Sequence, residues 1–395
     1  MKLYRTTIAV AALAAALALA DAAYAARAYI GTYTKDPAAG GRGAGNGEGI
    51  YMVDIDEATG APSHLRLMAK SLSPSWITLS ADHKFLYAVN EIATYGPNKN
   101  GSVTAYAVDA RSGALKQLNV ADSGGAIPCY VSIHPSGKFL LVANYTGGSY
   151  EVIRLKPDGS LGEVTDVVKP EGPMSVYNAA DKPPGMFGSL EPHGSRGHMI
   201  LPDPSGQYVL GADAGRDQIF VWKLDTNSGK LTQVSVTKSV PGAAPRHFAF
   251  SPDGKTLYQQ QEQDSRLTVY GFANGKLTQK GPSISTLPPG FQGSNTTSEL
   301  LIDKAGKHLY GANRNHDSIA TMDVQPDGSV KLVSNVHTEG TIPRSLTLDP
   351  TGRFLYSMNQ NADNLTTFRI GADGVPKFTG NFLGIGSPAV MVFLP

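Results

Sequence analysis

Residues 245–262 read PRHFAFSPDGKTLYQQQE, and this stretch contains the pattern that decides the fold. An apolar segment, FAF, leads into the polar turn SPDGK, and a second segment, TLY, follows the turn. A glycine in so short a turn supplies the positive φ that a tight hairpin requires. The stretch therefore predicts two antiparallel strands joined by a tight turn.

The same hairpin pattern occurs six times along the chain. Residues 128–145 read PCYVSIHPSGKFLLVANY, and residues 343–360 read PRSLTLDPTGRFLYSMNQ. The other three copies occupy residues 74–91, 198–213 and 298–314. Five copies have a glycine in the turn: Gly137, Gly206, Gly254, Gly306 and Gly352. The first copy has His83 at this place instead.

Each hairpin is followed by a third apolar segment, and a turn then leads to a weaker fourth segment. The third segments cover residues 102–108, 149–155, 218–224, 266–272, 318–324 and 364–370. Between turn glycines the pattern recurs every 46 to 69 residues, and four antiparallel strands at such a period are typical of propeller blades. Helical repeats are the alternative, and the hairpin glycines with β-branched and aromatic strands argue against them.

The two ends of the chain together supply one more blade. Residues 28–34, 49–55 and 65–70 match its second, third and fourth strands, and residues 387–394, SPAVMVFL, match the missing first strand. A shared blade closes the ring and leaves no open sheet edge. The sequence therefore predicts an all-β protein: a seven-bladed β-propeller with four-stranded antiparallel blades, built as one domain over residues 26–395.

Two segments fall outside the repeat. Residues 40–48 are rich in glycine, and residues 167–191, between the third and fourth blades, are rich in Pro, Gly and Ala. We expect both to be loops. Connections as long as the second are often functional lids or rims.

Residues 1–25 have the features of a secretory signal peptide. Lys2 and Arg5 precede an uncharged apolar run over residues 8–20, and Ala23-Tyr24-Ala25 matches the small-x-small cleavage pattern. The alternative is an uncleaved membrane anchor, but the run is shorter than the ~20 residues that a spanning helix needs. We expect cleavage after Ala25 and a periplasmic or secreted protein without a membrane anchor.

Composition and motifs exclude several classes of protein. The 395 residues include 34 Lys and Arg against 33 Asp and Glu, a net charge of +1, which excludes a broad basic field for nucleic acid. The single cysteine, Cys129, excludes an internal disulfide and a Cys-rich zinc site, and we interpret it as a packing residue. No phosphate-binding glycine loop, Gly-x-Ser-x-Gly or His-Glu-x-x-His motif is found. We expect a monomer without metal or other cofactor.

Blade geometry predicts where a functional site lies. The start of each first strand and the end of each second strand share one face of the ring, close to its centre. His198 and Arg246 start first strands in successive blades, whereas Glu262 and Arg314 end second strands. Two guanidiniums can hold an anion, a histidine can transfer a proton, and a glutamate can orient the imidazole or activate water.

The four residues suit the opening or closing of a lactone ring, because a carboxylate or an oxyanion develops in both reactions. Taken singly, each of them is more often structural, since structural networks also collect such residues. The prediction therefore depends on their convergence. Three more residues are second-rank candidates for substrate binding: His193, Glu299 and Arg344. Equivalent positions in other copies carry Trp76, Tyr130 and Tyr145, which we expect to line the channel.

With the motifs PRHFAFSPDGK, VANYTGGS and NRNHDSI, the repeats resemble the seven-bladed lactonase family, which includes a bacterial 6-phosphogluconolactonase and the fungal carboxy-muconate cyclase. The resemblance covers almost all of residues 28–394. In the fungal cyclase the proposed site is a His, an Arg, a Glu and a second Arg. Their order and spacing are similar to those of His198, Arg246, Glu262 and Arg314 here.

The resemblance implies an exported lactonase that hydrolyses a sugar-acid lactone by metal-independent acid/base catalysis. Its small-molecule partner would be an anionic lactone or a sugar acid. Since sugar phosphates are mainly cytosolic, export points to an unphosphorylated lactone. Two alternatives stay open: a muconate-type lactonising cycloisomerase that uses the same four residues, and a non-catalytic propeller that binds a ligand or a protein.

Overall fold

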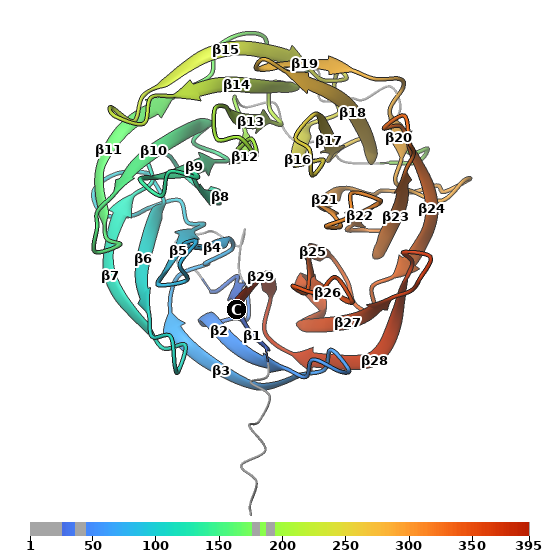
Figure 1. Cartoon of the computed structure of the whole chain (residues 1–395), viewed down its shortest axis with the longest axis horizontal. Helices are drawn as coiled ribbons and strands as arrows, with labels where there is room; N and C mark the ends of the chain where they lie inside the picture. Colours follow the sequence, from blue (N-terminus) through green and yellow to red (C-terminus); the bar gives the residue numbers. More distant parts are fainter. Residues whose placement is uncertain (1–25, 36–44, 176–181, 187–193, 395) are drawn as a thin grey trace, which may run out of the picture.

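The computed structural model describes residues 26–35, 45–175, 182–186 and 194–394. Seven twisted antiparallel sheets stand around a common axis as the blades of a propeller (Figure 1). Within a blade, the first strand lies nearest the axis and the fourth forms the outer wall (Figure 1). The predicted seven-bladed fold is therefore confirmed.

We number the blades from the one that contains the N-terminal strands. Blade 1 consists of β29 (Pro388–Leu394), β1 (Ala26–Thr32), β2 (Gly49–Ile55) and β3 (Pro62–Lys70). Blade 2 consists of β4 (Ile77–Leu79), β5 (Phe85–Asn90), β6 (Ser102–Val108) and β7 (Leu115–Asp122). Blade 3 consists of β8 (Pro128–Ile133), β9 (Phe139–Asn144), β10 (Ser149–Leu155) and β11 (Leu161–Val168). Blade 4 consists of β12 (Gly197–Pro202), β13 (Val209–Asp213), β14 (Gln218–Leu224) and β15 (Leu231–Lys238).

Blade 5 consists of β16 (Pro245–Phe250), β17 (Thr256–Gln261), β18 (Arg266–Ala273), β19 (Lys276–Gln279) and β20 (Ile284–Ser285). Blade 6 consists of β21 (Thr297–Ile302), β22 (His308–Asn313), β23 (Ser318–Val324) and β24 (Val330–His337). Blade 7 consists of β25 (Pro343–Leu348), β26 (Phe354–Asn359), β27 (Asn364–Ile370) and β28 (Pro376–Gly384), with the short 3-10 helix η1 (Gln360–Ala362) after β26.

Blade 5 departs from the expected four strands. Its fourth strand is divided into β19 and β20, and both pair with β18. Between them lie Gly281, with a φ of +69°, and Pro282. Because proline has no N–H to donate and fixes its own φ, it interrupts a strand at this place.

The ends of the chain close the ring as predicted. Strand β29 pairs antiparallel with β1, so that Met391 stands opposite Ile30 and Phe393 opposite Ala28. Met391 is 2% exposed and packs with Ala28 and Ile30 in an apolar cluster that also includes residues of blade 7. The first N-terminal strand covers Ala26–Thr32, two residues earlier than the sequence indicated.

The tight turns explain the one irregular copy of the repeat. The turn glycines have positive φ values, for example +68° at Gly137 and +69° at Gly254. His83 has the same left-handed conformation, with a φ of +56°. Histidine is one of the residues that tolerate this region better than most. The first hairpin therefore keeps the same turn without a glycine.

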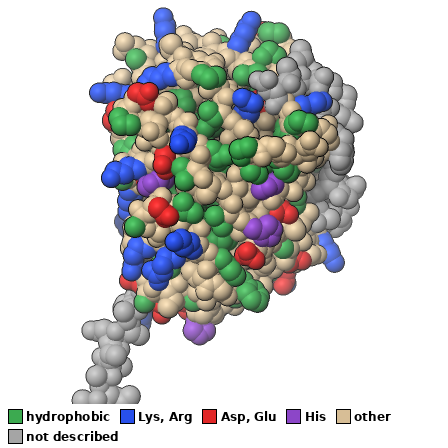
Figure 2. Space-filling model, turned by 90° about the vertical axis from the view of Figure 1, so that its right-hand side faces the viewer, with side chains coloured by type: hydrophobic (Ala, Val, Ile, Leu, Met, Phe, Trp, Pro, Cys, Tyr) green, Lys and Arg blue, Asp and Glu red, His purple; other side chains and the backbone are tan. Residues whose placement is uncertain are grey.

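The outer wall carries charges of both signs. Figure 2 shows one side of the ring, where Lys, Arg, Asp and Glu side chains are interspersed with hydrophobic ones. No helix in the described part of the chain has the length and hydropathy of a membrane span. The predicted signal peptide, residues 1–25, lies outside the described residues.

Candidate active site

A β-bulge at the start of the innermost strand directs one side chain of a blade toward the axis. In β8, β12, β16 and β25 the pairing register shifts just after the first residue. The residues left without a cross-strand partner are Cys129, His198, Arg246 and Arg344. A bulge takes such a residue out of the regular alternation of the strand, and bulges are common next to active sites because of this.

A second set of side chains is fixed by a backbone hydrogen bond that recurs in all seven blades. The residue just after the second strand donates its N–H to a carbonyl that precedes the innermost strand of the same blade, as Glu262 does to Ala244 over 2.8 Å. The other donors are Tyr33, Glu91, Tyr145, Ala214, Arg314 and Gln360. Two acceptors, Ile127 and Ile342, have φ values of +56° and +55°, which are unfavourable for β-branched residues. Such strain is often retained next to functional sites.

Most members of the two sets, all except Arg246 and Ala214, surround one cavity of about 250 Å³ at this end of the ring. All seven blades contribute to its wall. The lining residues are Tyr33, Glu91, Cys129, Tyr145, His198, Glu262, Arg314, Arg344 and Gln360. Of the four residues that the sequence brought together, three therefore face the same cavity.

Glu262 joins two guanidinium groups. Arg314 donates through Nη2 to Glu262 Oε1, and Arg246 Nε lies 3.6 Å from Glu262 Oε2. Burial by itself raises the pKa of this carboxyl, but Arg314 and Arg246 lower it more, so that it falls below its usual 4.5. Glu262 is therefore ionised at neutral pH. The geometry favours a role in which Glu262 holds Arg314 in place, and not a role as a proton donor.

His198 is an uncharged imidazole at the wall of the cavity. It is 4% exposed, and its buried Nδ1 has no hydrogen-bond partner among the residues that the structure describes. The ring meets Tyr145 and His247 edge to face, with centroids 5.6 and 5.1 Å away. Burial, followed by the nearby charge of Arg246, lowers the pKa of His198 well below 6.5. An imidazole that is neutral at pH 7 and lines a cavity can accept a proton from a molecule bound there.

Arg246 lies behind Glu262 and does not line the cavity. It is 1% exposed, and its Nη1 donates to the carbonyl of Ser298 over 2.6 Å. Burial, with the charges of Arg344 and Arg314, lowers its pKa to about 9, so Arg246 remains a cation at neutral pH. Its place favours a supporting role: it holds Glu262 and adds positive charge beneath the cavity.

One residue further along the innermost strands, aromatic and ionisable side chains fill the axis. Trp76 and Tyr130 stack at 4.5 Å, and the His247 ring meets both of them edge to face. His247 Nδ1 lies 3.1 Å from Glu299 Oε1, and burial lowers the pKa of His247 to about 4. Trp76, Tyr130 and the second-rank candidate Glu299 thus form a layer beneath the cavity, whereas Tyr145 lines the cavity as expected.

The remaining candidates have mixed outcomes. Arg344 lines the cavity from blade 7, next to blade 6, which carries Arg314. His193 lies outside the described residues. Cys129 is buried and lines the cavity as well; burial raises the pKa of its thiol, and Sγ lies 3.3 Å from the carbonyl oxygen of His198. It is therefore a neutral thiol that packs beneath His198.

Sequence reasoning missed Tyr33, Glu91 and Gln360. A signal for them was present, because Glu91 follows Asn90 at the end of a second strand just as Arg314 follows Asn313. Tyr33 and Gln360 hold the same place in blades 1 and 7. Applying the blade register to every copy of the repeat would have identified all three.

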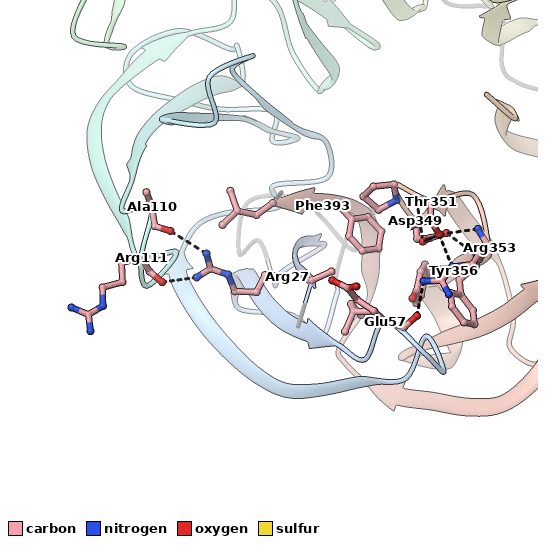
Figure 3. A pocket seen from close by; sticks show the side chains of 14 residues that line it. Arg27, Glu57, Ala110, Arg111, Asp349, Thr351, Arg353, Tyr356 and Phe393 are labelled. Carbon is pink, nitrogen blue, oxygen red and sulfur yellow. Dashed lines mark hydrogen bonds between the residues drawn. The ribbon is translucent and has the colours of Figure 1, made fainter. Parts of the chain in front are cut away.

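A second cavity, of about 490 Å³, lies at the opposite end of blades 1 and 7 (Figure 3). The polar groups at its rim serve the backbone. Arg27 donates to the carbonyls of Ala110 and Arg111, and Arg353 donates to the carbonyl of Glu57. Asp349 accepts the N–H of Phe354 within the β25–β26 turn. The two arginines thus join neighbouring blades, and the cavity contains none of the predicted site residues.

Part of the long connection between blades 3 and 4 crosses toward blades 5 and 6. The described residues 182–186 include Pro184, whose carbonyl accepts the N–H of Gly293 over 2.8 Å. Gly293 lies between β20 and β21. The segment predicted as a rim therefore reaches the blades that carry Glu262 and Arg314. Within the described ranges, no group of three or more His, Cys, Asp or Glu is placed to hold a metal ion.

Comparisons with known proteins agree with this architecture. Residues 27–393 match the family described as "Lactonase, 7-bladed beta-propeller". A 6-phosphogluconolactonase of Bacillus subtilis is 33% identical over 319 residues, which cover 80% of this chain and 83% of the relative. A 6-phosphogluconolactonase of Formosa agariphila is 30% identical over 76% of this chain and 82% of its own length. The structure of a periplasmic gluconolactonase of Pseudomonas aeruginosa superposes with a TM-score of 0.81 at 28% identity, covering 94% of this chain and 99% of that one.

Proposed function

Because the chain belongs to the seven-bladed β-propeller lactonase family, we propose that it is an exported enzyme that hydrolyses the lactone of an unphosphorylated sugar acid. The observation that carries the proposal is the neutral His198 at the wall of a cavity that also contains the Glu262–Arg314 pair. This set supplies a proton acceptor and a cation within one enclosed space.

The chemistry follows from the charges. His198 accepts a proton from a water molecule, and the water oxygen attacks the lactone carbonyl carbon. The carbonyl oxygen gains negative charge, which a guanidinium such as that of Arg314 stabilises. When the ring C–O bond breaks, the leaving oxygen takes the proton from the His198 imidazolium, and a carboxylic acid forms and ionises. The side chains described here supply these proton transfers, so we propose catalysis without a metal.

Glu262 has an orienting role in this scheme. It holds Arg314 Nη2, and Arg314 also donates to the carbonyl of Thr297 over 2.9 Å. Arg246 holds the other oxygen of Glu262 from behind. A guanidinium fixed in this way loses little conformational entropy when it binds the developing oxyanion, which is the benefit of preorganised electrostatics.

The charge of the site favours a substrate without a phosphate. Among the described residues, the cavity and the side chains directly behind it hold three guanidiniums (Arg246, Arg314 and Arg344) and three carboxylates (Glu91, Glu262 and Glu299). These charges balance, so the site has no excess positive charge for a further anionic group on the substrate. A phosphorylated sugar acid would bring a further dianion. The periplasmic location in the name of the Pseudomonas relative is compatible with export.

The relatives named 6-phosphogluconolactonase support a second candidate, the phosphorylated lactone. A direct test compares hydrolysis of glucono-δ-lactone and 6-phosphoglucono-δ-lactone by the purified mature protein, with and without EDTA, after correction for spontaneous opening. We expect higher kcat/KM for glucono-δ-lactone and no effect of EDTA. A preference for the phosphorylated lactone, or loss of activity with EDTA, would contradict the respective part of the proposal.

Export has its own test. Intact mass of the protein recovered from outside the cytoplasm is expected to correspond to a chain that begins at Ala26. A chain that retains residues 1–25 would contradict the predicted cleavage.

Closure of a muconate-type lactone by the same residues is the remaining enzymatic alternative, and incubation with cis,cis-muconate derivatives tests it.

A further inference from the structure

We propose that Tyr33, Glu91 and Arg344 form a subsite that recognises the hydroxyl groups of the substrate. The inference rests on the proposed lactone hydrolysis and adds the feature of the lactone that the enzyme selects. The three residues come from blades 1, 2 and 7, whereas Glu262 and Arg314 come from blades 5 and 6. The two groups therefore line neighbouring parts of the wall of one cavity, with Arg344 of blade 7 next to blade 6.

The triad is held together by its own contacts. Tyr33 donates its hydroxyl proton to Glu91 Oε2 over 2.8 Å and accepts a hydrogen bond from Arg344 Nε over 2.9 Å. Arg344 Nη2 lies 3.7 Å from the same Glu91 oxygen. Burial raises the pKa of Tyr33, so that its hydroxyl remains protonated and continues to donate. Burial lowers the pKa of Arg344, but the nearby Tyr33 and Glu91 raise it by more, so that the net shift is upward. Arg344 therefore stays a cation.

These contacts leave hydrogen-bonding groups available to a ligand. A guanidinium has five N–H donors, and only the Nε–H of Arg344 is used by a hydrogen bond to a residue that the structure describes. Glu91 Oε1 accepts no hydrogen bond from the described residues. The side chains of Arg344 and Glu91 are 12% and 15% exposed, and both line the cavity. A purely structural ion pair would direct more of its polar groups at its partner.

A free acceptor next to free donors fits neighbouring hydroxyl groups. One hydroxyl can donate to Glu91 Oε1 while the oxygen of the next accepts from an Nη–H of Arg344. A carboxylate is a poor partner for the carboxylate or phosphate of a ligand, because like charges repel. The subsite therefore fits the polyol part of a sugar lactone, and the site around His198 and Arg314 remains for the ester group.

Glu91 and Arg344 contact the substrate in this proposal, and Tyr33 is a positioning residue. Tyr33 Oη holds both of them at once, so its removal leaves their orientation free without changing the charge of the cavity. Sites built to bind a hydroxyl group discriminate strongly against analogues that lack it, because buried polar groups are then left unpaired.

The experiment compares two lactones of the same ring size, glucono-δ-lactone and the hydroxyl-free δ-valerolactone. For each, kcat/KM is divided by the rate constant of spontaneous hydrolysis. We expect the wild-type ratio to favour glucono-δ-lactone by about 10²-fold. Tyr33→Phe and Glu91→Gln are expected to lower this preference by about tenfold or more, while hydrolysis of δ-valerolactone changes by less than about threefold.

Glu151→Gln is the matched control. Glu151 is another buried carboxyl, at 0% exposure, but it does not line the cavity, and burial raises its pKa to about 9. Its replacement is expected to leave the substrate preference unchanged. Equal losses with both lactones in Tyr33→Phe and Glu91→Gln would overturn the subsite.

The outcomes also separate the two proposals. A wild-type enzyme that hydrolyses both lactones with no preference would overturn the hydroxyl subsite and leave lactone hydrolysis intact. A wild-type protein that hydrolyses neither lactone would overturn the proposed function. The wild-type comparison needs no variant, so it decides the matter even where Tyr33→Phe does not fold.

Discussion

Arg314 and Glu262 form an ion pair across the boundary between blades 5 and 6, in which Arg314 Nη2 donates to Glu262 Oε1. Both residues directly follow a second strand, and backbone hydrogen bonds to Thr296 and Ala244 fix them there. Arg246 contacts the other oxygen of Glu262. The repeated backbone geometry thus places the two side chains of the pair, and the pair supplies the positive charge that the proposed reaction requires.

Glu262→Gln is expected to reduce both stability and activity. The change leaves the guanidiniums of Arg246 and Arg314, 1% and 16% exposed, without their carboxylate, and breaking a buried pair in this way costs about 3–5 kcal/mol. Loss of the fixed Arg314 is expected to lower kcat/KM by about 10²-fold. Urea unfolding and steady-state kinetics measure the two effects.

The matched control for this variant is Glu163→Gln. Glu163 pairs with Arg154 on the surface, where its side chain is 64% exposed, and surface pairs contribute about 0–1 kcal/mol. Equal effects of the two substitutions would show that burial of the Glu262 pair has no special importance.

Arg314→Ala is expected to weaken binding of anions. The variant removes the positive charge that balances the product carboxylate, so inhibition by the aldonate product weakens by about tenfold or more, and kcat/KM for the uncharged lactone falls because the developing oxyanion is no longer stabilised. Arg314→Lys restores the charge but not the bidentate hydrogen-bonding geometry of a guanidinium, so we expect product inhibition to recover only in part. Product inhibition constants measured for wild type and both variants test this; an unchanged constant in Arg314→Ala would place the anion elsewhere.

The pH profile reports the protonation of His198. The base must be uncharged to accept a proton, and burial lowers its pKa well below 6.5. As pH falls, kcat/KM is therefore expected to stay level through 6.5 and to decline only at lower pH, where the imidazole becomes protonated. A decline centred near 6.5 in the initial rates would indicate a solvated histidine or another base.

Met391→Ala tests the closure of the ring. Met391 is 2% exposed in the cluster that joins β29, β1 and blade 7, and the loss of a large buried side chain costs about 2–5 kcal/mol. Phe382→Ala is the control, because Phe382 is 67% exposed and such surface changes stay within about 0.5 kcal/mol. Similar unfolding free energies for the two variants would contradict a closing role for β29.

The repeat allowed the fold to be predicted because each blade follows one pattern of strands and turns. The closing strand could be found as well, since 387–394 supplies the one strand that the N-terminal copy lacks. The division of the outer strand in blade 5 depends on the single Gly281-Pro282 interruption, which the repeat does not contain.

The sequence predicted which end of the ring carries the site, but not which side chains line the cavity and which lie behind it. Register at the strand ends brought His198, Glu262 and Arg314 to one cavity. It did not show that Arg246 lies behind Glu262, since depth depends on how long side chains from different blades pack around the axis. Glu299 illustrates the same limit. It lies one residue further along β21 than the strand position that reaches the cavity, and its side chain contacts His247 instead.

His198→Gln tests the central proposal most directly. The substitution keeps a polar side chain of similar size but removes the proton acceptor, and His337→Gln, an exposed histidine, serves as the control. In hydrolysis of glucono-δ-lactone, corrected for spontaneous opening, kcat of His198→Gln is expected to fall by about 10²–10⁴-fold with a smaller change in KM, while His337→Gln keeps wild-type kinetics. Wild-type kcat in a folded His198→Gln variant would contradict catalysis by this histidine.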